Sequence, residues 1–68
     1  RVIGCTARVT EEIDNEAGTG AVYVEGKTWT ARSSDGTVLP IGTRVIAERM
    51  EGVKLYVKPE PVSSTRQS

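Results

Sequence analysis

Residues 20–31 read GAVYVEGKTWTA, two short runs of alternating apolar residues on either side of a Glu-Gly pair. Alternation with a period of two is typical of β-strands that bury one face. The pair Glu25-Gly26 predicts a two-residue hairpin turn, because glycine accepts the positive φ that such turns require. The turn sets the register of the hairpin, and the expected opposite pairs are Val24 with Lys27, Val22 with Trp29, and Gly20 with Ala31.

This register divides the side chains of the hairpin between two faces. The strands are predicted over residues 20–24 and 27–33. One face is expected to turn inward, and it holds Gly20, Val22, Val24, Trp29 and Ala31. The other face is expected to turn outward, and it holds Tyr23, Thr28, Thr30 and Arg32.

The same period predicts a first strand over residues 3–13. Its inward residues are expected to be Cys5, Ala7, Val9 and Ile13, and its outward residues Thr6, Arg8 and Thr10. Cys5 is therefore interpreted as a small buried apolar residue. Residues 15–19 form the loop that follows, and residues 33–40 form a second loop that is too short for a helix of substance.

A fourth strand is predicted over residues 43–50 and a fifth over residues 53–58, joined by a turn at Glu51-Gly52. In a regular strand Val45 and Ala47 would face the same side, and Met50 would face the opposite side. A β-bulge near Glu48-Arg49 would bring all three inward. They would then face the inward residues of the fifth strand, which are expected to be Val53, Leu55 and Val57.

Five short strands with no window suited to an amphipathic helix predict an all-β fold, which closes most economically into a small barrel. We expect a five-stranded barrel of the OB type (oligonucleotide/oligosaccharide-binding) over residues 1–59, without a substantial helix. Residues 60–68 contain proline, serine and glutamine but no apolar period. They are predicted to be a flexible, disordered C-terminal tail.

Composition narrows the classes of function. The chain has 68 residues, and nine basic residues balance nine acidic ones, so the formal net charge is zero. A neutral chain lacks the long-range attraction that a basic protein has for phosphate. No apolar run reaches the roughly 18 residues of a membrane span. Because the chain begins at Arg1 without an initiator methionine, we expect it to be part of a longer protein.

Residues that could carry catalysis are few. The chain has no histidine and a single cysteine, Cys5, so neither a zinc site nor an activated thiol is expected. The acidic run over residues 11–16 lacks the spacing of a calcium loop. Ser33-Ser34-Asp35-Gly36 has no base beside it and is interpreted as a turn. We therefore predict no enzyme activity, no catalytic residue, no metal site and no cofactor.

Single-stranded nucleic acid is the alternative ligand, because OB barrels bind it with exposed aromatic residues in a basic groove. Tyr23 is expected to face outward beside Arg32, and Arg8 is a second candidate cation near them. Trp29 faces inward on the predicted register. One stacking residue on a neutral chain is a poor platform, so nucleic acid is the less favoured partner.

The order of these segments resembles a known family. The segments are residues 3–9 (IGCTARV), 20–26 (GAVYVEG), 29–33 (WTARS), 39–45 (LPIGTRV) and 51–57 (EGVKLYV). They are similar to the C-terminal soluble domain of NfeD-like membrane proteins, and the likeness covers residues 3–59. Trp29-x-Ala31 and the hairpin around Gly52 are its more specific parts.

The resemblance implies a soluble OB barrel that follows N-terminal membrane helices, so that contact with the membrane lies outside this chain. It also implies a protein partner, either a stomatin- or prohibitin-like membrane protein or a membrane protease whose activity is regulated. We expect the domain to be membrane-associated and on the cytoplasmic side. Longer family members carry a ClpP-class serine protease domain, which nothing in this chain matches.

A module of this kind would bind its partner through side chains or by adding a strand to an open sheet edge. The candidate partner-binding residues are Tyr23, Thr28, Thr30 and Arg32. This face is outward and central, and it combines an aromatic ring with a planar cation.

Overall fold

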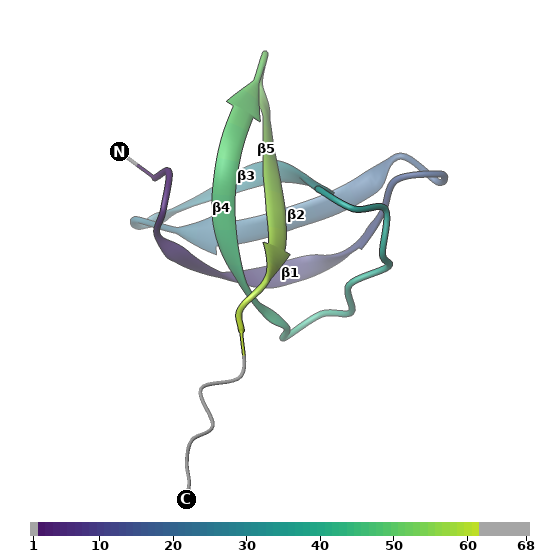
Figure 1. The fold of residues 1–68 in the computed structure, drawn as a ribbon, viewed down its shortest axis with the longest axis horizontal. Helices are drawn as coiled ribbons and strands as arrows, with labels where there is room; N and C mark the ends of the chain where they lie inside the picture. The colour runs from purple at the N-terminus through teal and green to yellow at the C-terminus, as the bar shows by residue number, and fades with distance from the viewer. Residues whose placement is uncertain (1, 62–68) are drawn as a thin grey trace, which may run out of the picture.

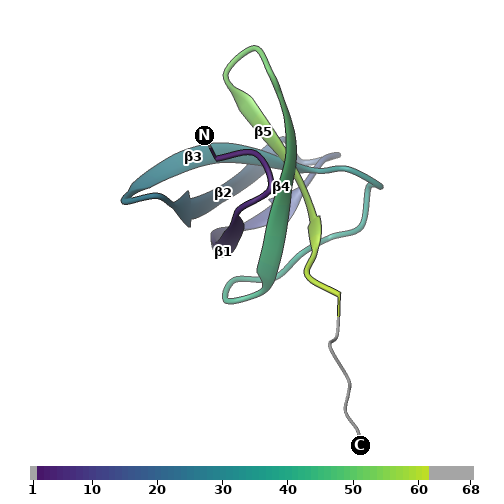
Figure 2. The same ribbon diagram turned by 60° about the vertical axis from the view of Figure 1, so that its left-hand side comes forward.

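The computed structural model describes residues 2–61. Its strands are β1 (Thr6–Asp14), β2 (Thr19–Val24), β3 (Lys27–Ser33), β4 (Arg44–Glu51) and β5 (Lys54–Pro59). They form a closed barrel in the order β1-β2-β3-β5-β4, in which β3 and β5 are parallel and the other neighbours antiparallel (Figures 1 and 2). The predicted all-β, five-stranded barrel is confirmed. Residues 2–61 contain no helix, and so none that could cross a membrane.

The β2–β3 hairpin has the register that its turn predicts. Val22 lies opposite Trp29, and Val24 lies opposite Lys27. Both turn residues have positive φ, 56° at Glu25 and 80° at Gly26. Two successive positive φ values define the turn whose twist matches that of paired strands. The left-handed conformation at Glu25, a residue with a side chain, carries a cost of about 1–2 kcal/mol.

Strand β1 bends around the barrel through two irregularities. Its register against β2 shifts between Val9 and Glu11 and again between Glu11 and Asp14. Two shifts restore the original parity, so Val9 and Ile13 both point inward and are completely buried. The strand begins at Thr6 rather than at the predicted Ile3. The segment before it is still attached to β4, because the Gly4 amide donates to the Ala47 carbonyl at 2.7 Å.

Gly20 allows β1, β2 and β3 to approach closely. A Cβ atom at this position would lie 2.5 Å from the Ala31 carbonyl oxygen and 2.9 Å from Cγ1 of Ile13. Its φ of 142° is also one that side chains rarely adopt. The absence of a side chain at Gly20 therefore allows the first three strands to curl tightly around one interior.

The β4–β5 hairpin contains the predicted bulge, since the register shifts between Ala47 and Arg49. The prediction that Met50 and Val53 face the interior is wrong, because they are 38% and 79% exposed. Met50 does lie opposite Leu55. The hairpin rises beyond the other strands, so its turn has no opposite wall to pack against (Figures 1 and 2).

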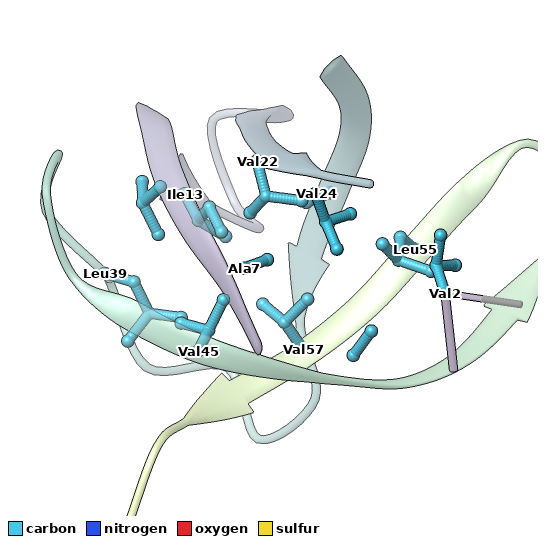
Figure 3. Close-up of a cluster of buried hydrophobic side chains, with 12 residues drawn as sticks. Val2, Ala7, Ile13, Val22, Val24, Leu39, Val45, Leu55 and Val57 are labelled. Atoms are coloured by element: carbon cyan, nitrogen blue, oxygen red, sulfur yellow. The ribbon is translucent and has the colours of Figure 1, made fainter. Parts of the chain in front are cut away.

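The core is formed by aliphatic side chains that point toward one another from all sides of the barrel (Figure 3). The buried apolar residues are Val2, Ala7, Val9, Ile13, Val22, Val24, Ala31, Leu39, Val45, Ala47, Leu55 and Val57. Each buried valine or leucine stabilises the fold by roughly 1.5–3 kcal/mol. This core shows that the alternating residues of all five strands enclose a single interior.

Two residues expected inside lie at the margin of this core. Trp29 and Cys5 are only half-buried and pack against it. The Lys27 ammonium lies 4.8 Å from the centroid of the Trp29 ring, which is a cation–π contact. Cys5 Sγ lies 3.6 Å from Glu25 Oε2. Both residues thus lie at the margin of the core rather than at its centre.

The chain leaves the barrel beside β4. The Glu60 amide donates to the Arg44 carbonyl at 2.9 Å, and Arg44 Nε donates to Glu60 Oε1 at 3.0 Å. The sequence predicts a tail over residues 60–68. Its residues from 62 onward lie outside the described residues.

Candidate functional site

The predicted outward face is formed by neighbouring parts of β2 and β3. Tyr23 lies directly opposite Thr28, and Thr30 lies opposite Ala21. Tyr23 is 51% exposed, and both threonines are exposed. The side chains of Tyr23, Thr28 and Thr30 form no hydrogen bond with residues 2–61. These three residues therefore expose an aromatic ring and two hydroxyl groups on one face of the sheet.

The Arg32 guanidinium does not join the group of Tyr23 and the two threonines, because it is held by hydrogen bonds to backbone carbonyls. Its Nη2 donates to the Gly18 carbonyl at 2.9 Å, and its Nη1 donates to the Ala31 carbonyl at 2.7 Å. Arg32 is half-buried, and it lies opposite Tyr56 on β5 rather than opposite Tyr23. Its guanidinium group thus fastens the β1–β2 loop to β3, at the far end of the candidate face.

The cation beside Tyr23 is Arg8. It lies directly opposite Tyr23 on β1, and on its other side it lies opposite Arg44 of β4. Arg8 is exposed and forms no ion pair with any residue between 2 and 61. The alternation in β1 indicates that Arg8 points outward. The sequence suggested Arg8 as a candidate neighbour of Tyr23, but it could not give their direct pairing, because the β1–β2 register depends on two bulges.

In the turn Ser33-Ser34-Asp35-Gly36, which begins at the end of β3, the Asp35 carboxylate accepts hydrogen bonds from within the turn and from the residue after it. Asp35 Oδ1 accepts hydrogen bonds from the Thr37 amide at 2.9 Å and from Ser33 Oγ at 3.0 Å. These bonds, the one from the Thr37 amide first, lower the pKa of Asp35. A carboxylate with a lowered pKa is a weak base, so this arrangement does not activate Ser33.

The acidic residues near the β1–β2 loop, in the run 11–16, include two whose carboxylates accept hydrogen bonds from backbone amides. Asp14 Oδ1 accepts hydrogen bonds from the amides of Glu16 at 3.1 Å and Ala17 at 3.2 Å. Glu11 Oε1 accepts one from the Gly20 amide at 3.3 Å. Residues 2–61 bring no three potential ligands together around a metal ion, and they enclose no pocket.

The comparison with protein families assigns the whole barrel, and not one face of it, to a family. Residues 1–59 match the NfeD-like C-terminal, partner-binding domain. The chain belongs to the NfeD-like family. The resemblance inferred from the order of the strand segments is confirmed.

Solved structures similar to this NfeD-like domain include two from different organisms. One is the C-terminal domain of a stomatin operon partner protein from Pyrococcus horikoshii, with 31% identity and a TM-score of 0.79; the match covers 90% of this chain and 91% of that one. The other is the soluble domain of a membrane protein implicated in regulation of membrane protease activity, from Corynebacterium glutamicum. It has 30% identity and a TM-score of 0.79, and covers 88% of this chain and 94% of that one. No curated protein sequence matched the NfeD-like chain.

Proposed function

We propose that this NfeD-like domain is the partner-binding part of a membrane-anchored protein. In this proposal it recruits a stomatin- or prohibitin-like partner on the cytoplasmic side and thereby influences a membrane protease. The observation that carries the proposal is the match of residues 1–59 to a partner-binding domain. The two similar solved domains support it, since one belongs to a stomatin operon partner protein and the other to a protein implicated in protease regulation.

The contact surface that we assign to the partner is the outward face around Tyr23, Thr28 and Thr30, with Arg32 at its end. Tyrosine is enriched among the residues that dominate binding energy, because it offers a large contact area and loses little conformational entropy. Closure of the barrel favours docking through side chains over addition of a strand. The role we infer is binding rather than catalysis.

The test is an isothermal titration calorimetry experiment. The 68-residue chain is titrated with the soluble part of a stomatin-like protein encoded in the same genome. We expect saturable binding, which Tyr23→Ala weakens by about tenfold. The control is Val53→Ala, which removes an exposed apolar group from the tip of the β4–β5 hairpin. We expect this control to change the affinity by less than about twofold.

The two parts of the proposal fail separately. If the stomatin-like protein does not bind, the assigned partner is wrong. If it binds and Tyr23→Ala has no more effect than Val53→Ala, the assigned face is wrong and the partner stands.

A further inference from the structure

One row of outward-facing side chains crosses four strands of the barrel. Arg44 of β4 lies opposite Arg8 of β1, Arg8 lies opposite Tyr23 of β2, and Tyr23 lies opposite Thr28 of β3. These four residues are called the arginine–tyrosine row. Because directly opposite side chains on neighbouring strands have Cβ atoms about 5 Å apart, their functional groups can contact one ligand together.

The two arginines of this row form an arrangement that destabilises the sheet by itself. Like charges directly opposite each other on neighbouring strands repel. The chain compensates for one of them, since Glu60 Oε1 lies 3.0 Å from Arg44 Nε. Arg8 has no carboxylate partner among residues 2–61. The row therefore already holds one carboxylate and leaves the second cation uncompensated.

Two other exposed cations of the barrel have carboxylate partners, whereas Lys54 has none among residues 2–61. Arg49 Nε donates to Glu51 Oε2 at 2.6 Å, and its guanidinium lies 4.5 Å from the centroid of the Tyr56 ring. The Lys58 ammonium lies 3.3 Å from Glu48 Oε2. The contrast with Arg8 is informative, because Arg8 is the cation that stands between a second arginine and an exposed aromatic ring.

We propose that the arginine–tyrosine row binds an acidic, extended segment of the partner protein, with a partner carboxylate on the Arg8 guanidinium. The planar guanidinium matches a carboxylate with two parallel hydrogen bonds. The Tyr23 ring provides apolar contact beside it, and the Thr28 hydroxyl can donate to a second acceptor. This inference rests on the proposed partner-binding function and adds the chemistry of what is bound.

A peptide fits this row better than a nucleic acid strand does. Binding to nucleic acid draws on several phosphate contacts and on several stacked bases. The row has two arginines, one of them already paired with Glu60, and a single aromatic ring. The formal net charge of zero adds no long-range attraction to a polyanion. One free cation beside one ring instead matches a single carboxylate on a short segment.

The test uses a fluorescein-labelled dodecapeptide of alternating Glu and Thr, with a peptide of alternating Gln and Thr as the neutral probe. Fluorescence anisotropy measures affinity, and amide chemical shifts of the ¹⁵N-labelled chain locate the contact. We expect the Glu peptide to bind and to shift the amides of Arg8, Tyr23 and Thr28. Arg8→Glu should weaken binding by about tenfold or more, and Arg8→Gln by a smaller factor.

Two further variants separate the proposal from a general effect of charge. Lys54→Glu makes the same change of charge at the β4–β5 hairpin, and it should alter the affinity by less than about twofold. Glu60→Gln removes the carboxylate that occupies Arg44 and should strengthen binding by about twofold or more. Damage to the fold would not strengthen binding, so this gain distinguishes recognition from a structural role.

Several results would overturn the proposal. They are equal binding of the Gln peptide, no binding of the Glu peptide, an affinity that Arg8→Glu leaves unchanged, or shifts confined to the β4–β5 hairpin. Tighter, Arg8-dependent binding of a thymidine oligonucleotide would assign the row to nucleic acid instead. If the stomatin-like protein binds equally well to the wild type and to Arg8→Glu, this inference fails while the proposed function stands. If only the acidic peptide binds, the inference stands and the partner is a different protein.

Discussion

Asn15 and Ser33 exchange two hydrogen bonds at one end of the barrel. Asn15 Nδ2 donates to the Ser33 carbonyl, and the Ser33 amide donates to Asn15 Oδ1, both at 2.9 Å. The side-chain amide thus takes the place of a neighbouring strand at the end of β3. Ser33 is only 1% exposed, so its backbone groups would otherwise have no hydrogen-bond partner there.

Replacing Asn15 tests this relationship. Asn15→Ala removes both bonds and should lower the free energy of unfolding by about 1–3 kcal/mol. Asn15→Asp keeps an acceptor for the Ser33 amide but places a carboxylate against the Ser33 carbonyl, so a similar loss is expected. Urea denaturation measures both, with Glu16→Ala as the neighbouring control that should stay within about 0.5 kcal/mol of the wild type. If Glu16→Ala lowered the free energy of unfolding as much as Asn15→Ala does, the loss would come from the loop as a whole and not from the Asn15–Ser33 bonds.

The close approach at Gly20 predicts a large loss for Gly20→Ala. The new Cβ would clash with the Ala31 carbonyl oxygen and would also strain the backbone, so we expect a loss of about 3 kcal/mol or more. Gly18→Ala is the matched control, because Gly18 has a φ of 74° but no atom within 4 Å of an added Cβ. It should cost about 1–2 kcal/mol. Equal losses in thermal or urea unfolding would contradict a tight contact between β2 and β3.

The β2–β3 turn offers a stabilising substitution. Glu25 has a φ of 56°, which asparagine tolerates better, so Glu25→Asn should raise the free energy of unfolding by about 0.5–1 kcal/mol. Glu51→Asn makes the same change before Gly52, where the preceding residue has no positive φ, and no gain is expected. A loss of stability in Glu25→Asn would show that the contact of Glu25 Oε2 with Cys5 Sγ outweighs the backbone strain.

Stability should fall in acid partly because of Glu48. The hydrogen bond from Ser34 Oγ, at 2.6 Å, and then the Lys58 ammonium lower the pKa of Glu48. A lowered pKa in the folded state stabilises the protein above the unfolded-state pKa, and this contribution is lost as the pH falls through the folded value.

Glu48→Gln should therefore show a shallower fall in unfolding free energy between about pH 5 and pH 3 than the wild type does. Denaturation at a series of pH values measures the two slopes. Glu16→Gln is the control, because the Glu16 side chain forms no hydrogen bond or ion pair with residues 2–61, and it should keep the wild-type slope. Identical slopes for wild type and Glu48→Gln would contradict the prediction.

Local patterns in the chain predict most of the fold. The period of two and the Glu25-Gly26 turn were enough to predict the β2–β3 register, and the broken parity after Ala47 was enough to predict the β4 bulge. Alternation cannot show where a strand runs beyond its neighbours, so Met50 and Val53 were expected inside but lie exposed at a projecting hairpin. Burial depends on an opposite wall, which is a property of the whole barrel.

The sequence alone determined that this chain is all-β with five short strands, because turn chemistry and apolar alternation act between near neighbours. The order of its strand segments carried the resemblance to the C-terminal soluble domain of NfeD-like proteins. Only the tertiary structure decided that Arg8 rather than Arg32 stands beside Tyr23, and that Asn15 pairs with Ser33. Those contacts join residues brought together by bulges and by closure of the barrel. Their geometry depends on how all five strands curl at once, which no local pattern specifies.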